Sequence, residues 1–216
     1  MPLAAASPIA RRERRVAQRR QGILDAAARI FGEVGYERAT LDTIGEAVGL
    51  SKASLYYYVR GKEELLGRLL SGVIEEIARR ATRGLPALPS AEERLRRFLA
   101  AHVEVVCGDR TGVLLARHQD VVLGAAHSRA MRAARRRHER SLEAILAQGF
   151  AEKAFRKVNV RLVAYLILGA LHGVPRWHDR LPGTTPEEIA ESLSSLVLDG
   201  LRVRAPGSNR RSAHAK

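Results

Sequence analysis

The chain has 216 residues, of which 46% are hydrophobic and 5% aromatic, so its core is expected to consist mainly of Leu, Val, Ile and Ala. One cysteine, Cys107, excludes an internal disulfide framework, and the longest strongly apolar run, Leu162–Leu171, is too short to span a bilayer, which needs about 20 residues. The formal net charge is +14.

The positive charge is concentrated in three arginine-rich segments. Residues 1–20, 129–140 and 202–216 each carry a net charge of +5, and the rest of the chain is close to neutral. A basic arm before a DNA-binding helix strengthens binding by releasing counterions from DNA, whereas a solvated tail that aids solubility explains the terminal segments equally well. The arginines are not preceded by an apolar signal segment, so a cytoplasmic location is expected.

The N-terminal third predicts a small helical unit. The first ten residues are small and Pro-containing and are expected to be disordered. A helix is predicted over about 16–34, ended by Gly35, because an apolar stripe runs along it: Ile23, Ala27, Ile30, Phe31 and Val34.

Two short helices joined by a tight turn are predicted between residues 40 and 62. Thr40 and Ser51 suit the N-cap positions of the two helices, and Gly49 stands where a left-handed residue would end the first. Leu55 and Val59 give the second helix an inward face. This pattern is a helix-turn-helix, whose second helix can enter the DNA major groove.

Three consecutive tyrosines, Tyr56, Tyr57 and Tyr58, occupy the second helix. At about 100° per residue they spread over about 200°, so they cannot all be buried in so small a unit. Exposed tyrosines suit contacts to phosphates, base edges and thymine methyl groups, in company with Lys52, Ser54 and Lys62. An aromatic cluster that packs helix against helix is the alternative.

From about Arg20 to Leu70 the chain resembles the N-terminal domain of TetR-family transcriptional regulators. The matching motifs are RxxILxAAxxxFxxxGY at Arg20–Tyr36, TLxxI at Thr40–Ile44 and AxGLSKxSLYYYVxxKEEL at Ala47–Leu65. Three residues depart from the usual pattern, which has Thr, Ala and Gly at these positions: Ala39, Gly45 and Ala53. The first two can alter a phosphate contact and loosen the first helix of the motif, and the third can alter which base is read.

This resemblance implies an all-α fold of about nine helices with a DNA-binding site on the motif. The residues expected to contact DNA are Thr40, Thr43, Lys52, Ala53, Ser54, Tyr56, Tyr57, Tyr58 and Lys62. The implied domains are a disordered basic arm at 1–16, a helix-turn-helix domain at 17–77 (motif about 41–60) that includes the start of a connector helix, a ligand-binding and dimerisation domain at 78–203, and a disordered basic tail at 204–216.

The C-terminal part predicts further helices. Lys62 opens a long helix to about residue 82, and the capping box Ser90–Glu93 opens the next. A short helix is expected over 111–119 and a long one over 128–148, ended by Gly149. The last two begin near Asn159 and at the capping box of Thr185, and the final one is stopped by Gly200.

A weaker resemblance covers the end of the chain. GALxxVxRWH at Gly169–His178, LPGxxxEEIA at 181–190 and the late DGL at 199–201 are similar to the regulatory half of TetR-family repressors that respond to acyl-coenzyme A thioesters. It implies an apolar slot for an acyl chain, with arginines that meet the coenzyme's phosphates. The candidate ligand-binding residues are Phe98, His102, Arg135, Arg136, His138, Arg176 and Trp177.

Other interpretations of these residues remain open. His102 suits a satisfied core histidine, Cys107 a small buried hydrophobe, and Trp177 a core or interface anchor. Four arginines share one face of the helix over 128–148, which is either solvated or binds an acidic group: Arg129, Arg132, Arg136 and Arg140.

The last two helices carry more apolar surface than one protomer can cover. A self-complementary four-helix interface of a C2 homodimer would cover it. The residues expected there are Leu166, Ile167, Ala170, Leu193, Leu196 and Val197.

These observations favour a ligand-responsive DNA-binding regulator, with a repressor as the first expectation and an activator left open. Its expected partners are an operator in double-stranded DNA, a second copy of the chain and a small apolar or acyl-coenzyme A-like effector; no membrane partner, cofactor or metal is expected. Catalytic and phosphate-loop motifs are missing from the sequence, so no enzyme is expected. A sequence-tolerant DNA-compacting protein and a drug-responsive efflux regulator are the alternatives.

Overall fold

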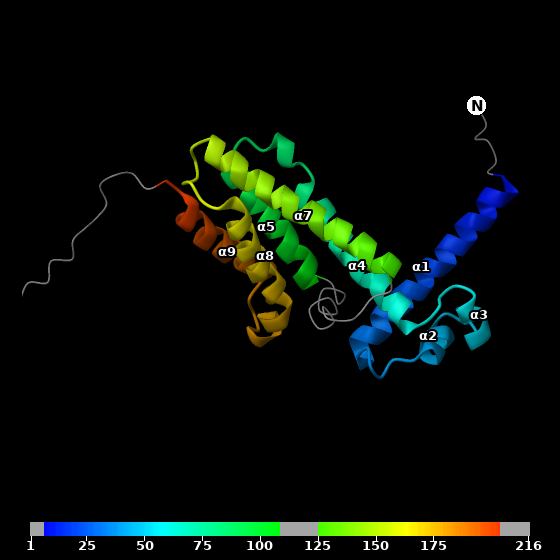
Figure 1. The fold of residues 1–216 in the computed structure, drawn as a ribbon. Helices are drawn as coiled ribbons and strands as arrows, with labels where there is room; N and C mark the ends of the chain where they lie inside the picture. The colour runs from blue at the N-terminus through cyan, green and yellow to red at the C-terminus, as the bar shows by residue number, and fades with distance from the viewer. Residues whose placement is uncertain (1–6, 109–124, 204–216) are drawn as a thin grey trace, which may run out of the picture.

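The computed structural model describes residues 7–108 and 125–203. Within these ranges the fold is all-α, as the sequence predicts (Figure 1). The helix expected over 111–119 and the tail at 204–216 lie outside the described residues. The α-helices are α1 (Pro8–Val34), α2 (Leu41–Ala47), α3 (Lys52–Tyr56), α4 (Lys62–Thr82), α5 (Ala91–Gly108), α7 (Ala125–Ala151), α8 (Val160–Trp177) and α9 (Pro186–Leu201), with 3-10 turns η1 (Leu85–Ala87) and η2 (His178–Arg180).

Helices α1 to α3 form the N-terminal unit, and the caps expected from the sequence are confirmed. Thr40 and Thr43 form a reciprocal capping box on α2: the Thr43 amide donates to Thr40 Oγ1 at 3.1 Å, and the Thr40 amide donates to Thr43 Oγ1 at 3.2 Å. Ser51 Oγ accepts from the Ser54 amide at the start of α3. Gly49, with φ of +65°, makes the left-handed turn between the two helices.

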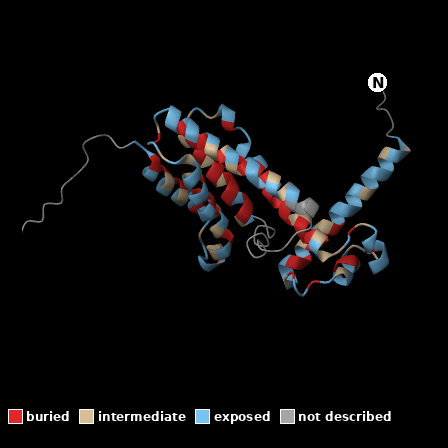
Figure 2. Cartoon of the chain, viewed as in Figure 1, coloured by how far each residue is buried: buried red, intermediate tan, exposed pale blue. Residues whose placement is uncertain are grey.

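The expected start of the first helix was wrong. Helix α1 begins at Pro8 rather than near residue 16, with Ser7 at its N-cap. Proline is preorganised for the first turn of a helix, and the Ala and Arg residues that follow are strong helix formers. Residues 8–16 therefore form a helical extension, not a disordered arm, and residues 11–15 are exposed along it (Figure 2).

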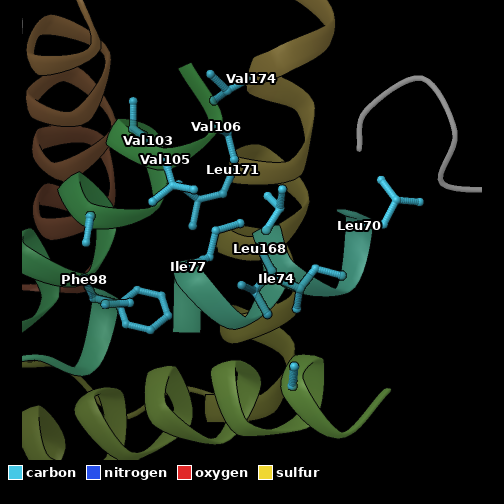
Figure 3. Packing of buried hydrophobic residues seen from close by; sticks show 14 of the residues in the cluster. Leu70, Ile74, Ile77, Phe98, Val103, Val105, Val106, Leu168, Leu171 and Val174 are labelled. Carbon is cyan, nitrogen blue, oxygen red and sulfur yellow. The ribbon is translucent and has the colours of Figure 1, made fainter. Parts of the chain in front are cut away.

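Helix α4 joins this unit to the C-terminal bundle. It contacts α1 on one side and packs against α5 and α7 on the other, while α5 packs against α9 and α7 against α8. The residues labelled in the apolar cluster of Figure 3 come from α4, α5 and α8: Leu70, Ile74 and Ile77 of α4, Phe98, Val103, Val105 and Val106 of α5, and Leu168, Leu171 and Val174 of α8. Movement of the bundle can therefore reach the N-terminal unit through one continuous helix.

The sequence suggests that Gly149 ends its helix, but α7 continues to Ala151. Gly149 is buried, and its carbonyl accepts hydrogen bonds from the amides of Ala154 and Phe155, both at 3.0 Å. A Cβ atom at this position would lie 2.1 Å from the Phe155 ring. The glycine therefore makes room for the buried ring of Phe155. Helix α9 likewise runs one residue past Gly200, to Leu201.

Replacing Gly149 with alanine is expected to lower the free energy of unfolding by about 1–3 kcal/mol, because the ring or the backbone must move. Gly72→Ala is the matched control. Gly72 also lies within a helix and is exposed, and a Cβ atom added to it would meet no neighbouring atom within 4 Å, so this change should stabilise α4 by up to about 1 kcal/mol. Urea denaturation of both variants measures the difference. Equal stability of the two variants would contradict the tight packing at Gly149.

Candidate nucleic-acid interface and effector cavity

The recognition segment, residues 51–59, consists of α3 and the turn that follows it. Helix α3 ends at Tyr56, so Tyr57 and Tyr58 lie beyond the helix expected to hold all three tyrosines, and the three rings do not share one environment. Leu55 and Val59 are buried, which turns Tyr56 (50% exposed) and Tyr57 (68% exposed) outward. Tyr58 is partly buried against the core, and its ring meets that of Tyr57 edge to face at 5.1 Å. The packing alternative therefore applies to Tyr58, whereas the rings of Tyr56 and Tyr57 are available to a partner and their contact with DNA stays a prediction.

Five of the other residues expected to contact DNA are also exposed: Thr40, Thr43, Lys52, Ala53 and Ser54. The ammonium of Lys52 pairs with Asp42 of α2 at 3.0 Å. An exposed pair of this kind contributes little to stability, so Lys52 can exchange Asp42 for a phosphate at small cost.

Lys62 connects α4 to the turn that follows α1. Its ammonium donates to the carbonyl oxygens of Tyr36 at 2.8 Å and Glu37 at 3.2 Å, and it lies 4.3 Å from the centre of the Tyr36 ring. A lysine ammonium has three N–H donors, so one more can reach a phosphate. Lys62 thus has a structural contact that the sequence did not reveal.

Gly45 is required by the turn of the motif. Leu50 donates its amide to the Gly45 carbonyl at 2.8 Å, and a Cβ atom on Gly45 would lie 2.8 Å from the Leu50 carbonyl oxygen. Gly45 therefore lets the Leu50 carbonyl lie closer to α2 than a residue with a side chain would allow.

A basic cleft separates the helical extension of α1 from the tyrosines. Its volume is about 1120 Å³, and one wall carries Arg11, Arg12, Arg15 and Arg19, while the other carries Tyr57 and Tyr58. Guanidinium groups beside one exposed and one partly buried tyrosine ring suit the phosphates and sugars of nucleic acid. The sequence shows that the N-terminal segment is basic, but it does not reveal that these arginines lie beside the recognition segment.

A second, small cavity lies in the bundle. It has a volume of about 70 Å³ and lies among four helices: its apolar walls come from α4 (Ile74, Ile77) and α8 (Leu168), and its polar walls are His102, Arg135, His138, Glu139 and His172. His102 and His138 are buried and hydrogen-bonded to each other, with Nδ1 of His102 and Nε2 of His138 3.0 Å apart. Phe98 stacks on His138 at 4.5 Å between ring centres.

The histidines of this cavity are held neutral. Burial, with a contribution from His172, lowers the pKa of His138 to about 4. Burial also lowers the pKa of His102 well below its ordinary value, and burial together with the charges of Arg135 and Arg176 lowers the pKa of His172. At neutral pH the cavity therefore presents uncharged imidazoles.

Acidification is expected to destabilise the fold through these histidines. The pKa of a histidine is near 6.5 in the unfolded chain, whereas that of His138 in the folded chain is about 4. Between these two pH values the unfolded chain therefore binds more protons than the folded chain does. The stabilisation is complete above pH 6.5 and is lost as the pH falls towards 4; His138 alone accounts for about 2 kcal/mol between pH 7.5 and pH 5. Urea denaturation at these two pH values measures it, and His138→Leu should flatten the dependence. A free energy of unfolding that does not change over this range would contradict the prediction.

The structure brings only part of the expected ligand-binding set together. Phe98, His102, Arg135 and His138 meet at the cavity, and the charge of Arg176 acts on His172 nearby. Arg136 is exposed and does not line the cavity, and Trp177 lines a different groove between α8 and α9. His172 and the two isoleucines of α4 were missed. The spacing of Leu168 and His172, one helical turn apart, was the available signal.

An apolar face is exposed on α8 and α9. Leu166 is 66% exposed and Leu196 75%, with Leu162 and Tyr165 also exposed beside Leu166. Of the other expected interface residues, Ala170 is exposed and Leu193 and Val197 are partly so. The expectation that Ile167 lies in the interface is wrong, because it is buried within the protomer. It follows Leu166 directly, and successive residues of a helix point about 100° apart around its axis.

Both halves of the chain match known protein families. Residues 23–69 match the bacterial regulatory proteins of the tetR family, and residues 89–201 match the tetracyclin repressor-like C-terminal domain. The chain belongs to the TetR family. It is 25% identical over 188 residues to the HTH-type transcriptional repressor KstR2 of Mycobacterium tuberculosis, covering 86% of this chain and 94% of that protein.

Solved structures agree with this TetR-family fold. The regulator PfmR from Thermus thermophilus has a TM-score of 0.75 at 31% identity, covering 84% of this chain and 99% of that one. AibR, solved with isovaleryl coenzyme A and operator DNA, has a TM-score of 0.71 at 22% identity, covering 82% and 97%. The family expected from the sequence is thereby confirmed, and this TetR-family protein is a transcriptional regulator.

Two further findings concern the described part of the chain. None of its helices is long and apolar enough to cross a membrane. Its His, Cys, Asp and Glu side chains form no group of three that could hold a metal ion.

Proposed function

We propose that this TetR-family protein is a homodimeric repressor that a coenzyme A thioester releases from a palindromic operator. The observation that carries the proposal is the course of α4. One end of this helix holds the DNA-binding unit through Lys62, and further along Ile74 and Ile77 form a wall of the histidine-lined cavity.

In the operator complex, each protomer places its exposed recognition surface in the major groove. Lys52, Ala53, Ser54, Tyr56 and Tyr57 read bases, supported by the packed ring of Tyr58. Phosphates are bound by Thr40, Thr43, Lys62 and the arginines of the α1 extension. The exposed faces of α8 and α9 pair with those of a second copy, which sets the two recognition helices about 34 Å apart.

The effector acts by enlarging the cavity. A volume of about 70 Å³ is far below the roughly 300 Å³ or more of ordinary small-molecule sites, so an acyl chain can enter only when the surrounding helices move. Ile74 and Ile77 lie on α4, so this movement shifts the helix that carries the DNA-binding unit. Effector binding then favours a dimer geometry that no longer matches both grooves.

The ligand class is supported by charge and by similarity. Arg135 and Arg176 lie close enough to His172 to lower its pKa, and these cations suit the phosphates of coenzyme A. The similar protein AibR was solved with isovaleryl coenzyme A and operator DNA.

The test is DNA binding to the chain's own upstream region, at fixed salt, with and without isovaleryl, octanoyl and stearoyl coenzyme A. Specific binding that one thioester releases is expected. Specific binding released by none of them would disprove the thioester and leave drug-like apolar effectors. Equal binding to unrelated DNA, with a steep salt dependence, would favour the compacting protein, for which the arginine-lined cleft beside α1 offers a surface.

A further inference from the structure

We propose that the part of the effector that enters the cavity carries a neutral oxygen, as a hydroxyl or a carbonyl group, which hydrogen-bonds to the His102–His138 pair. The inference deepens the proposed function and rests on it. It concerns selectivity: the cavity would distinguish an oxygenated acyl chain from a plain hydrocarbon chain of the same length.

The histidine pair has a fixed hydrogen-bonding capacity. A neutral imidazole has one N–H donor and one nitrogen acceptor. The bond between His102 Nδ1 and His138 Nε2 uses one donor and one acceptor, whichever ring donates. The two outer nitrogens, His102 Nε2 and His138 Nδ1, must therefore present one donor and one acceptor in either tautomeric arrangement.

These outer nitrogens have no hydrogen-bond partner within the described residues. Both are buried, and both rings line the cavity. Buried polar atoms in folded proteins are nearly always paired, because the lost hydration is otherwise not replaced. A hydrocarbon entering the cavity would leave both nitrogens unpaired, whereas an oxygen atom would satisfy one of them.

The surroundings favour a neutral oxygen over a charged group. The imidazoles are uncharged near neutral pH, and the apolar walls are Ile74, Ile77 and Leu168. The two charged side chains that line the cavity, Arg135 and Glu139, have opposite signs. A carboxylate or an ammonium group would enter without a net opposite charge to compensate its desolvation.

The location of the pair links selectivity to the response. His102 lies on α5 and His138 on α7, and they share the cavity with the two isoleucines of α4. An oxygen bound to the pair holds the ligand against the helix that must move. An oxygenated effector would therefore release the operator at a lower concentration than its hydrocarbon analogue.

The experiment compares three thioesters of equal chain length: octanoyl, 3-hydroxyoctanoyl and 8-hydroxyoctanoyl coenzyme A. The concentration that releases half of the operator from the full-length protein is measured for each. One hydroxylated thioester is expected to act at a concentration at least tenfold lower than octanoyl coenzyme A. Octanoyl coenzyme A acting at an equal or lower concentration than both hydroxylated compounds would overturn the inference.

Variants separate the histidine pair from other causes. His102→Leu combined with His138→Leu should abolish the tenfold preference while the operator is still bound. His102→Gln, which keeps a donor and an acceptor, should retain part of it. His178 does not line the cavity, so the control variant His178→Leu should leave the preference unchanged.

A measurement on the unmodified protein covers the case in which the leucine variants do not fold. Nitrogen-15 NMR of the imidazoles should show shifts at His102 Nε2 or His138 Nδ1 with the preferred hydroxylated thioester but not with octanoyl coenzyme A.

If specific operator binding is intact but none of the three thioesters releases it, the thioester class is wrong, and 1-hexanol is compared with hexane by the same spectra. Shifts with the alcohol alone would still support the inference, and shifts with neither would overturn it.

Discussion

Replacing Tyr57 with alanine is expected to weaken operator binding by about 1–3 kcal/mol for each protomer of the dimer, the usual range for the loss of a side chain that reads a base. The ring is 68% exposed, so its removal costs little packing and the thermal midpoint should barely change. Fluorescence anisotropy with labelled operator at fixed salt, alongside a thermal melt, measures both effects.

Two variants serve as controls for this prediction. Phe150→Ala removes an aromatic ring that is 46% exposed near the C-terminal end of α7 and should leave operator affinity unchanged. Tyr57→Phe keeps the ring and loses the hydroxyl, so it separates the aromatic contact from a hydrogen bond. Operator affinity unaffected by Tyr57→Ala would remove this ring from the interface. Lys62→Ala is a poorer test, because it also removes the hydrogen bonds to Tyr36 and Glu37.

The double substitution Leu166→Asp and Leu196→Asp should convert the protein to a monomer and abolish cooperative operator binding. The two leucines are 66% and 75% exposed, so the monomer should remain folded. In the proposed dimer each interface would bury four carboxylates without partners, and the dimer dissociation constant should rise at least about a hundredfold. Sedimentation analysis and operator titration follow the two consequences.

The matched control here is Val203→Asp, which places a carboxylate at another exposed apolar residue, 57% exposed and outside α8 and α9. It should remain dimeric. A double variant that stays dimeric and binds the operator normally would place the dimer interface on a different face.

The helix-turn-helix was predictable because its determinants are local. Thr40, Ser51 and Gly49 act within three or four residues of their own positions, and all three do what the sequence indicates. The start of α1 was missed although its signal is also local: Ser7 followed by Pro8 is a helix start, but it lies in a segment whose composition favours disorder.

The errors further along the chain have a different cause. Gly149 carries a helix-stop signal that is overridden by packing against Phe155. The histidine pair joins α5 to α7, and a sequence pattern gives the register within each helix but not between two helices. His172 lines the cavity from a third helix, α8, and its position relative to the pair could not be predicted for the same reason. The cavity therefore became visible only when the helices were assembled.

The hydrogen bonds of Lys62 to the carbonyls of Tyr36 and Glu37 attach the N-terminal end of α4 to the DNA-binding unit (α1 to α3), which is called the head below. A tilt of α4 therefore moves the head with it. Ile77 lies fifteen positions along α4 from Lys62, a distance of about 22 Å at 1.5 Å rise per residue. A tilt of about 5° at the cavity end would displace the head by about 2 Å, and by about 4 Å between two heads related by a twofold axis. That is more than a tenth of the roughly 34 Å between successive major grooves, so a small swelling of the bundle suffices to put the two heads out of step with the DNA.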